Sequence, residues 1–307
     1  MKRSNRFVLI LMLMFSVFGY SQQESQYTQY MYNTMQFNPG YTGSRGVGSL
    51  FGLYRTQWVG LDGAPKTSNL SFHTPIKNKN VGLGLSIHHE TIGPQTDTNL
   101  MVDFSYTLNL ENSKLAFGIK GTAGFFHIDY NKLRLQDSGD YIFTGGDNRI
   151  FSPNVGAGLY WYSDNWYLGL SVPTLLETDV YSRNDRSISV LKNTQHYYLI
   201  GGYVFDLSDS VKFKPAALSK LAYGTPLQLD LSANFMFNER FVLGAAWRWS
   251  AAVSAMAGFQ ISDRWFIGYG YDFETTELSK YNSGSHEIFL RYEFIKTYKK
   301  VVSPRFF

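Results

Sequence analysis

Hydrophobic and polar residues alternate with a period of two along much of the chain. In the segment 81–88, valine, leucine and isoleucine occupy one face, while glycine, serine and histidine occupy the other. The same alternation recurs at 100–109, 227–237 and 265–273. Successive side chains of a β-strand point to opposite faces, so this period predicts strands with one apolar face and one polar or small face.

Fourteen candidate strands follow when this pattern is extended along the chain. They are 46–59, 67–75, 80–92, 97–110, 114–129, 151–162, 165–172, 194–205, 211–222, 226–237, 240–250, 253–262, 264–274 and 284–296. Many reach ten residues, whereas strands of soluble proteins average about five or six. About nine to eleven tilted residues cross a membrane. Strand length and the even count therefore favour a closed barrel in an outer membrane.

The connections between these strands alternate in length. Every second one is a short turn, at 77–79, 111–113, 163–165, 206–210, 238–239 and 262–264, and the others are generally longer, including 130–150, 173–193 and 275–283. A soluble sandwich also has apolar and polar faces, but it has no reason to keep this parity. We expect an all-β fold, an antiparallel transmembrane outer-membrane β-barrel of about 14 strands with short periplasmic turns and long extracellular loops.

The first 21 residues have the features of a cleaved signal peptide. Lys2, Arg3 and Arg6 precede an apolar run over 7–18, and small residues occupy the −3 and −1 positions of a cleavage site before Gln22. The run is too short for a membrane anchor, which needs about 18 to 20 apolar residues. We expect export to the outer membrane and three parts: 1–21 signal peptide, 22–45 N-terminal segment, and 46–307 barrel.

Composition removes several classes of function. The chain has 22 Tyr, 24 Phe and 28 Gly among 307 residues, a mixture that favours strands over helices. It has no cysteine, which excludes disulfides, thiolate metal sites and cysteine nucleophiles. Removal of the signal peptide leaves 25 basic against 24 acidic residues, so we expect no nucleic-acid partner.

Polar residues that alternate with the apolar face should point into the lumen. They are Arg55, Gln57, Asp103, Lys120, Asp230, Arg248, Arg291 and Glu293. One interpretation is the selectivity lining of a pore, and the other is a structural ion-pair network that fills the lumen. A barrel of about fourteen strands lies between packed eight-stranded and open sixteen-stranded barrels.

The segment 22–45 could fill part of such a lumen. Tyr27, Tyr30, Met31, Thr34 and Phe37 recur at helical spacing, and Asn38-Pro39-Gly40 would end that helix. The segment is therefore expected to act as a plug of the lumen or as a periplasmic tether.

Catalytic and metal-binding signals are weak. In His88-His89-Glu90 the neighbouring histidines point to opposite faces of a strand, and no further ligand follows at a diagnostic spacing. His127 with Asp129, and His286-Glu287, lie beside loops, and we find no glycine-rich phosphate loop or nucleophile elbow. We expect no catalytic residues, no metal, no cofactor and no enzymatic activity.

The start of the expected mature chain resembles a known family. Tyr30 and Asn33 belong to the run QYMYN, and Asn38, Pro39, Tyr41 and Gly43 to the run FNPGYTGS. Further matching runs are YRTQW at 54–58, SHEI at 285–288, Arg291-Tyr292 and the ending SPRFF at 303–307. Together they are similar to the PorP/SprF family of type IX secretion and gliding motility proteins of Bacteroidetes.

The resemblance implies an outer-membrane barrel that helps to secrete or anchor a partner surface protein. The implied partner is adhesin-like, with a C-terminal sorting domain, and periplasmic secretion or motility components and outer-membrane lipid are further partners. Long loops carry residue types that often anchor protein interfaces, so docking on them is expected at Tyr141, Phe143, Tyr181, Arg183 and Arg186. The alternative is a passive or ligand-specific porin.

Overall fold

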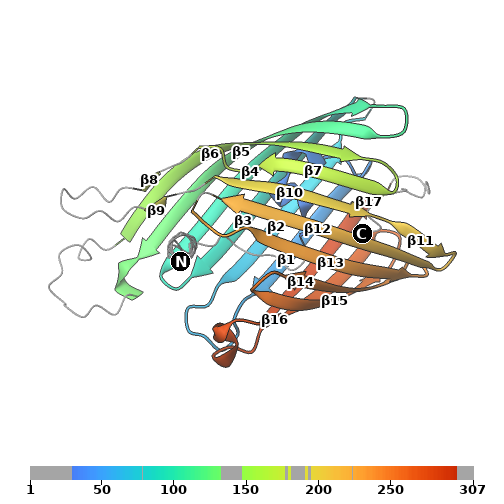
Figure 1. Cartoon of the computed structure of the whole chain (residues 1–307). Helices are drawn as coiled ribbons and strands as arrows, with labels where there is room; N and C mark the ends of the chain where they lie inside the picture. Colours follow the sequence, from blue (N-terminus) through green and yellow to red (C-terminus); the bar gives the residue numbers. More distant parts are fainter. Residues whose placement is uncertain are drawn as a thin grey trace, which may run out of the picture.

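Antiparallel strands make up most of the protein (Figure 1). The computed structural model describes residues 30–77, 79–132, 147–176, 179–180, 191–192, 195–222 and 224–295. The barrel strands are β1 (Gly48–Thr56), β2 (Lys66–Pro75), β3 (Val81–Ile92), β4 (Gln95–Asn109), β5 (Lys114–Asp129), β6 (Asp147–Tyr162), β7 (Trp166–Val172), β10 (His196–Tyr203), β12 (Val211–Ala222), β13 (Gln228–Phe237), β14 (Phe241–Arg248), β15 (Ala252–Gln260), β16 (Trp265–Glu274) and β17 (Ser285–Phe294).

The strands pair with their neighbours in chain order, and two pairings close the ring. β1 pairs with β17, and β7 continues through β10 to β12. The result is a closed antiparallel barrel of 14 strands, as the alternation predicts. β11 (Phe205–Ser208) adds to the periplasmic end of β12, while β8 (Asp179–Val180) and β9 (Leu191–Lys192) form a separate pair.

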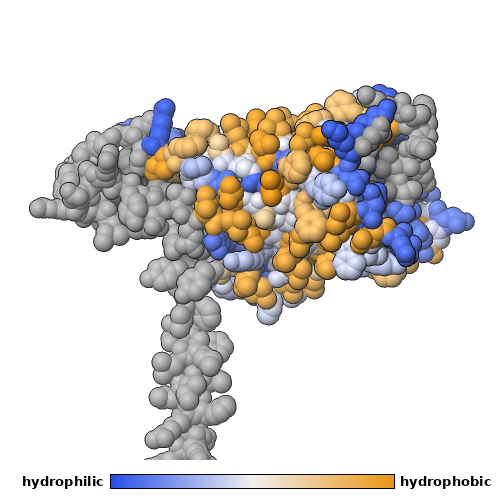
Figure 2. Space-filling view, turned by 90° about the horizontal axis from the view of Figure 1, so that it is seen from above, coloured by the Kyte–Doolittle hydropathy of each residue, from blue (hydrophilic) through white to orange (hydrophobic). Residues whose placement is uncertain are grey.

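The two faces of each strand meet different surroundings. On β5, Ala116, Gly118 and Lys120 are buried inside, whereas Phe117 and Ile119 are exposed on the outside. Figure 2 shows the exposed apolar side chains as a belt around the middle of one face, with hydrophilic side chains toward the ends. Such a belt is what the hydrocarbon layer requires of a barrel. Among the described residues, no helix has both the length and the hydropathy for a membrane crossing.

Two details of the expected connections need correction. The connection between β3 and β4 is only Gly93-Pro94, and that between β14 and β15 is 249–251, so the outer rim also has tight turns. Gly93 has a φ of 55°, a conformation that glycine adopts without strain. The expected turn 206–210 is also partly strand, since Phe205 and Asp206 pair with β12.

The expected N-terminal helix is much shorter than its spacing suggests. Helix α2 (Thr34–Phe37) is a single turn, and η1 (Pro39–Tyr41) is a 3₁₀ turn. Asn38 separates them, because its side chain accepts a hydrogen bond from the Gly40 amide and Pro39 has no amide to donate. The remaining turns are η2 (Tyr130–Lys132) and η3 (Glu277–Lys280), and Tyr27 lies outside the described residues.

Candidate functional site: the occupied lumen

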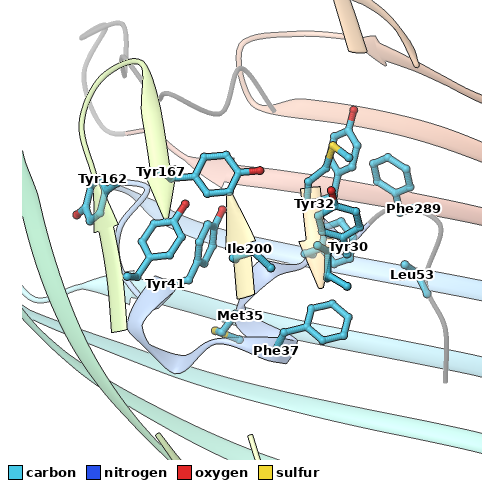
Figure 3. Close-up of a cluster of buried hydrophobic side chains, with 14 of the residues drawn as sticks. Tyr30, Tyr32, Met35, Phe37, Tyr41, Leu53, Tyr162, Tyr167, Ile200 and Phe289 are labelled. Atoms are coloured by element: carbon cyan, nitrogen blue, oxygen red, sulfur yellow. The ribbon is translucent and has the colours of Figure 1, made fainter. Parts of the chain in front are cut away.

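Residues 30–45 lie inside the barrel, and we call them the luminal segment. Their apolar side chains pack against inward-facing aromatic and aliphatic residues of several strands (Figure 3). The Tyr32 ring lies 4.4 Å from the Phe289 ring and 5.5 Å from the Phe266 ring, centre to centre. Met35 retains 1% of its exposure. The segment is thus part of the core of the protein.

Along one wall of the lumen, the luminal segment packs directly against the backbone of glycine residues. A Cβ atom added at Gly118 would lie 2.1 Å from the Gly40 nitrogen, and one at Gly158 would lie 2.2 Å from Asn38 Oδ1. These distances are too short for any side chain, so glycine is required there. The glycines that approach the segment in this way, which we call the glycine seat, are Gly82 and Gly84 on β3, Gly118 on β5, Gly158 on β6 and Gly169 on β7.

Hydrogen bonds fix the segment on this seat. Asn38 is fully buried, and its Nδ2 donates to the Leu159 carbonyl at 2.8 Å. The Ser105 hydroxyl donates to the Thr42 carbonyl at 2.6 Å. Because these polar groups are buried, breaking either hydrogen bond costs more free energy than breaking one at the surface would.

Lys120 reaches the end of the single helical turn. Its Nζ donates to the Met35 carbonyl at 3.1 Å and to the Gln36 carbonyl at 3.3 Å. The same Nζ lies 3.2 Å from Asp103 Oδ1. A cation beside unpaired carbonyls at a helix end satisfies those acceptors. Lys120 therefore joins the barrel wall to the luminal segment.

Strand β2 supplies a second group of contacts. Asn33 Nδ2 donates to Asn69 Oδ1 at 2.8 Å, and Asn69 Nδ2 donates to Gln36 Oε1 at 3.0 Å. The Gly43 amide donates to His73 Nδ1 at 3.1 Å. Side-chain amides that bond in pairs hold both partners in one orientation.

The sequence-predicted luminal residues are all buried. They are Arg55, Gln57, Asp103, Lys120, Asp230, Arg248, Arg291 and Glu293. Sequence reasoning did not assign Arg45, Asp272 and Glu287 to the lumen, where they pair with members of this set. Asp272 and Glu287 alternate with apolar residues and could have been found by that signal, whereas Arg45 precedes the strands.

The charges form pairs inside the lumen. Arg55 lies 2.6 Å from Asp272 and 3.3 Å from Glu287, atom to atom. Arg248 lies 3.0 Å from Asp230. Buried charges persist only where an opposite charge and hydrogen bonds compensate the loss of water. The pairs thus have the arrangement of a structural network.

The luminal segment runs from the outer half of the lumen to the periplasmic mouth. Tyr30 is beside Ser232 and Asp230, near the outer end of β13. At the other end, Arg45 Nε donates to Glu293 at 2.6 Å, next to the periplasmic end of β17. The segment therefore lies along the path that a solute would take.

The neighbouring histidines of β3 lie on opposite faces of the barrel wall. His88 is buried while His89 is exposed and bonds to Thr98, so they face opposite sides. Glu90 accepts a hydrogen bond from Thr67. In the described part of the chain, no group of three or more histidine, aspartate or glutamate residues could hold a metal ion.

The expected docking residues cannot be placed. Tyr141, Phe143, Tyr181, Arg183 and Arg186 lie outside the described residues. So do the expected signal peptide, over 1–21, and the run at 303–307.

Fold and lumen together define an outer-membrane β-barrel whose interior is occupied by its own N-terminal segment. The family model "Type IX secretion system membrane protein PorP/SprF" matches residues 19–292. The chain belongs to this family, and it is an outer-membrane component of type IX secretion. The family and the fold point to a secretion component rather than an enzyme.

Comparisons with other proteins add only distant likenesses. No curated protein sequence matches the chain. The chain is similar to the outer membrane protein Omp33 of Acinetobacter baumannii, with 7% identity, a TM-score of 0.49, and coverage of 81% of this chain and 98% of that one. It is also similar to a Pseudomonas aeruginosa FadL homologue, with 12% identity, a TM-score of 0.48, and coverage of 85% and 94%. These similarities are too distant to indicate a function for the chain.

Proposed function

We propose that this barrel helps to secrete or anchor a partner surface protein, which docks on the outer loops. The partner is adhesin-like and has a C-terminal sorting domain that the type IX system recognises. Membership of the secretion family supports the class of partner. The occupied lumen supports docking at the surface, because residues 30–45 lie in the path through the barrel.

The buried luminal segment is the observation that carries this proposal. A porin needs a water-filled interior, and wide barrels provide one. Here Asn38 is fully buried on the glycine seat, and Lys120 bonds to the Met35 and Gln36 carbonyls. Outward-facing surfaces therefore remain as the place for recognition.

Loop replacement tests the proposal. The connections after β5 and β7, over 133–146 and 177–194, are replaced together by tight turns in the native organism. The pairing of the 14 barrel strands does not include these loops, which contain the separate β8–β9 pair, so the barrel should still assemble. Surface retention of the partner should fall severalfold. Surface labelling with an antibody to the partner measures retention, and heat-modifiable gel mobility measures assembly.

The connection between β16 and β17 provides a matched control. It lies on the same rim, spans 275–284 and contains η3, so it can be shortened to a similar turn. This control should retain the partner. Undiminished retention in the double-loop variant, at a normal barrel level, would contradict docking on those loops.

Bilayer conductance separates the proposal from the porin alternative. The intact barrel should pass little current, and deletion of residues 24–41 should open a pore if the luminal segment blocks it. Large, solute-selective conductance of the intact barrel would instead favour a porin.

A further inference from the structure

Two arginines meet one carboxylate at the periplasmic mouth of the lumen. Arg45 ends the luminal segment, and Arg291 and Glu293 lie on the inward face of β17. The three residues retain between 5% and 8% of their exposure. Arg45 Nε donates to Glu293 Oε1 at 2.6 Å, and Arg45 Nη2 contacts the same oxygen. Arg45 and Glu293 therefore form a close buried ion pair.

Arg291 has no comparable partner in the described part of the chain. Its Nε lies 3.5 Å from Glu293 Oε1, which is long for a hydrogen bond to an oxygen that Arg45 already occupies. Among the described residues, no acceptor bonds to Arg291 Nε or Nη1. The guanidinium lies 4.9 Å from the centre of the Phe266 ring, a contact that favours a cation but leaves these two donors unsatisfied. Buried donors of this kind call for an acceptor.

The charges of these side chains do not balance. Arg45 and Arg291 are positive, and Glu293 alone is negative. His73 and Tyr41 lie beside them. The His73 ring is neutral, because its Nδ1 accepts a hydrogen bond from a backbone amide, and a tyrosine phenol is neutral at pH 7. One buried positive charge thus remains among these residues, and water would satisfy its donors without neutralising it.

We propose that this cluster binds a small inorganic oxyanion such as phosphate. The anion supplies the missing negative charge and the acceptors for Arg291 Nε and Nη1, and an arginine fork suits the geometry of an oxyanion. Because Arg45 belongs to the luminal segment and Arg291 to β17, the anion offsets the repulsion between the two guanidiniums. It therefore strengthens the attachment of the luminal segment to the last strand of the barrel.

Calorimetric titration of inorganic phosphate into the purified full-length barrel, in a non-ionic detergent at fixed ionic strength, tests the site. We expect one phosphate to bind per barrel. Arg291→Gln should weaken phosphate binding about tenfold, because it removes the unpaired cation and leaves the Arg45–Glu293 pair balanced. Glu293→Gln should act in the opposite direction and strengthen binding about tenfold, since it leaves two cations without a carboxylate.

Arg240 provides the matched control, since it is an exposed arginine on a periplasmic turn. Arg240→Gln should leave phosphate binding unchanged. Absence of binding to the wild-type barrel, equal binding by Arg291→Gln and the wild type, or weaker binding by Glu293→Gln would overturn the proposal.

Heat-modifiable gel mobility establishes the folding of each variant. If Arg291→Gln does not fold, Arg291→Lys replaces it, because lysine keeps the charge and removes the planar fork. Its phosphate affinity should fall about threefold, and an unchanged affinity would count against the proposal in the same way.

Discussion

Opposite walls of the lumen hold the luminal segment in different ways. Strands β3 to β7 approach it with glycines and bare backbone, as at Gly118 and Gly158. Strands β16 and β17 approach it with the large side chains of Phe266 and Phe289, and the Arg55 cluster is buried in the same wall, formed by β16, β17 and β1. Next to the glycine wall the luminal segment fills the space, whereas next to the other wall the side chains of the wall itself fill most of it.

This difference determines which substitutions each wall tolerates. The glycine seat depends on shape, so any added side chain must displace the segment. The opposite wall depends on charge balance, so removing one partner leaves buried charge behind. Three substitutions test these two kinds of sensitivity.

The largest effect is expected at Arg55, on the charged wall. Arg55→Met removes the cation that Asp272 and Glu287 share, and the free energy of unfolding should fall by about 3 to 5 kcal/mol. Urea unfolding in detergent micelles, followed by tryptophan fluorescence, measures it. The triple variant with Asp272→Asn and Glu287→Gln should recover most of the loss, and a triple variant as unstable as Arg55→Met would refute the charge argument.

A smaller loss is expected at the glycine seat. Gly118→Val should lower the free energy of unfolding by about 2 to 3 kcal/mol, since its Cβ would overlap the backbone at Pro39 and Gly40. Limited proteolysis should also cut the displaced luminal segment faster. Gly121→Val on the same strand is the control, because an added Cβ there meets nothing within 4 Å. Similar behaviour of the two variants would show that the seat does not select glycine.

The smallest effect is expected from one polar contact on the seat. Asn38→Ala removes the hydrogen bonds to the Leu159 carbonyl and the Gly40 amide, at a cost of about 1 to 2 kcal/mol. The temperature of the heat-modifiable gel shift should fall accordingly. Asn109→Ala, at an exposed position, should leave it unchanged. A shift no larger than that of Asn109→Ala would mean that packing alone holds the segment.

Much of the fold is readable from the sequence because lipid and lumen impose a strict period of two. The predicted strands 114–129 and 211–222 coincide with β5 and β12. Tight outer turns such as Gly93-Pro94 were less predictable, since glycine and proline mark a turn without fixing the rim on which it lies. The extent of β11 was also obscured, because its register with β12 shifts between Asp206 and Ser208.

The structure of the luminal segment could be predicted only in part from its local sequence pattern. Its spacing predicted a helix that ends at Asn38-Pro39-Gly40, and the helix does end there, but it begins only at Thr34, so a single turn forms. The Asn33 side chain bonds to Asn69 on the barrel wall, a contact that the local spacing does not show. Its seat was detectable in principle, since glycines such as Gly82 and Gly84 occupy the inward face where a lumen needs volume. The partners of those glycines could not be inferred, because the contacts join residues far apart in the chain.

The long reach of the luminal segment governs the order in which the protein can fold. Arg45 pairs with Glu293, 248 positions later, and Tyr32 stacks on Phe266 and Phe289. The segment precedes every barrel strand, yet the part of its binding surface that β16 and β17 supply exists only once the last strands are in place. Contacts of such sequence separation are slow to form. Docking of the luminal segment is therefore coupled to closure of β1 on β17. A barrel that closes before the segment has docked would be a kinetic trap.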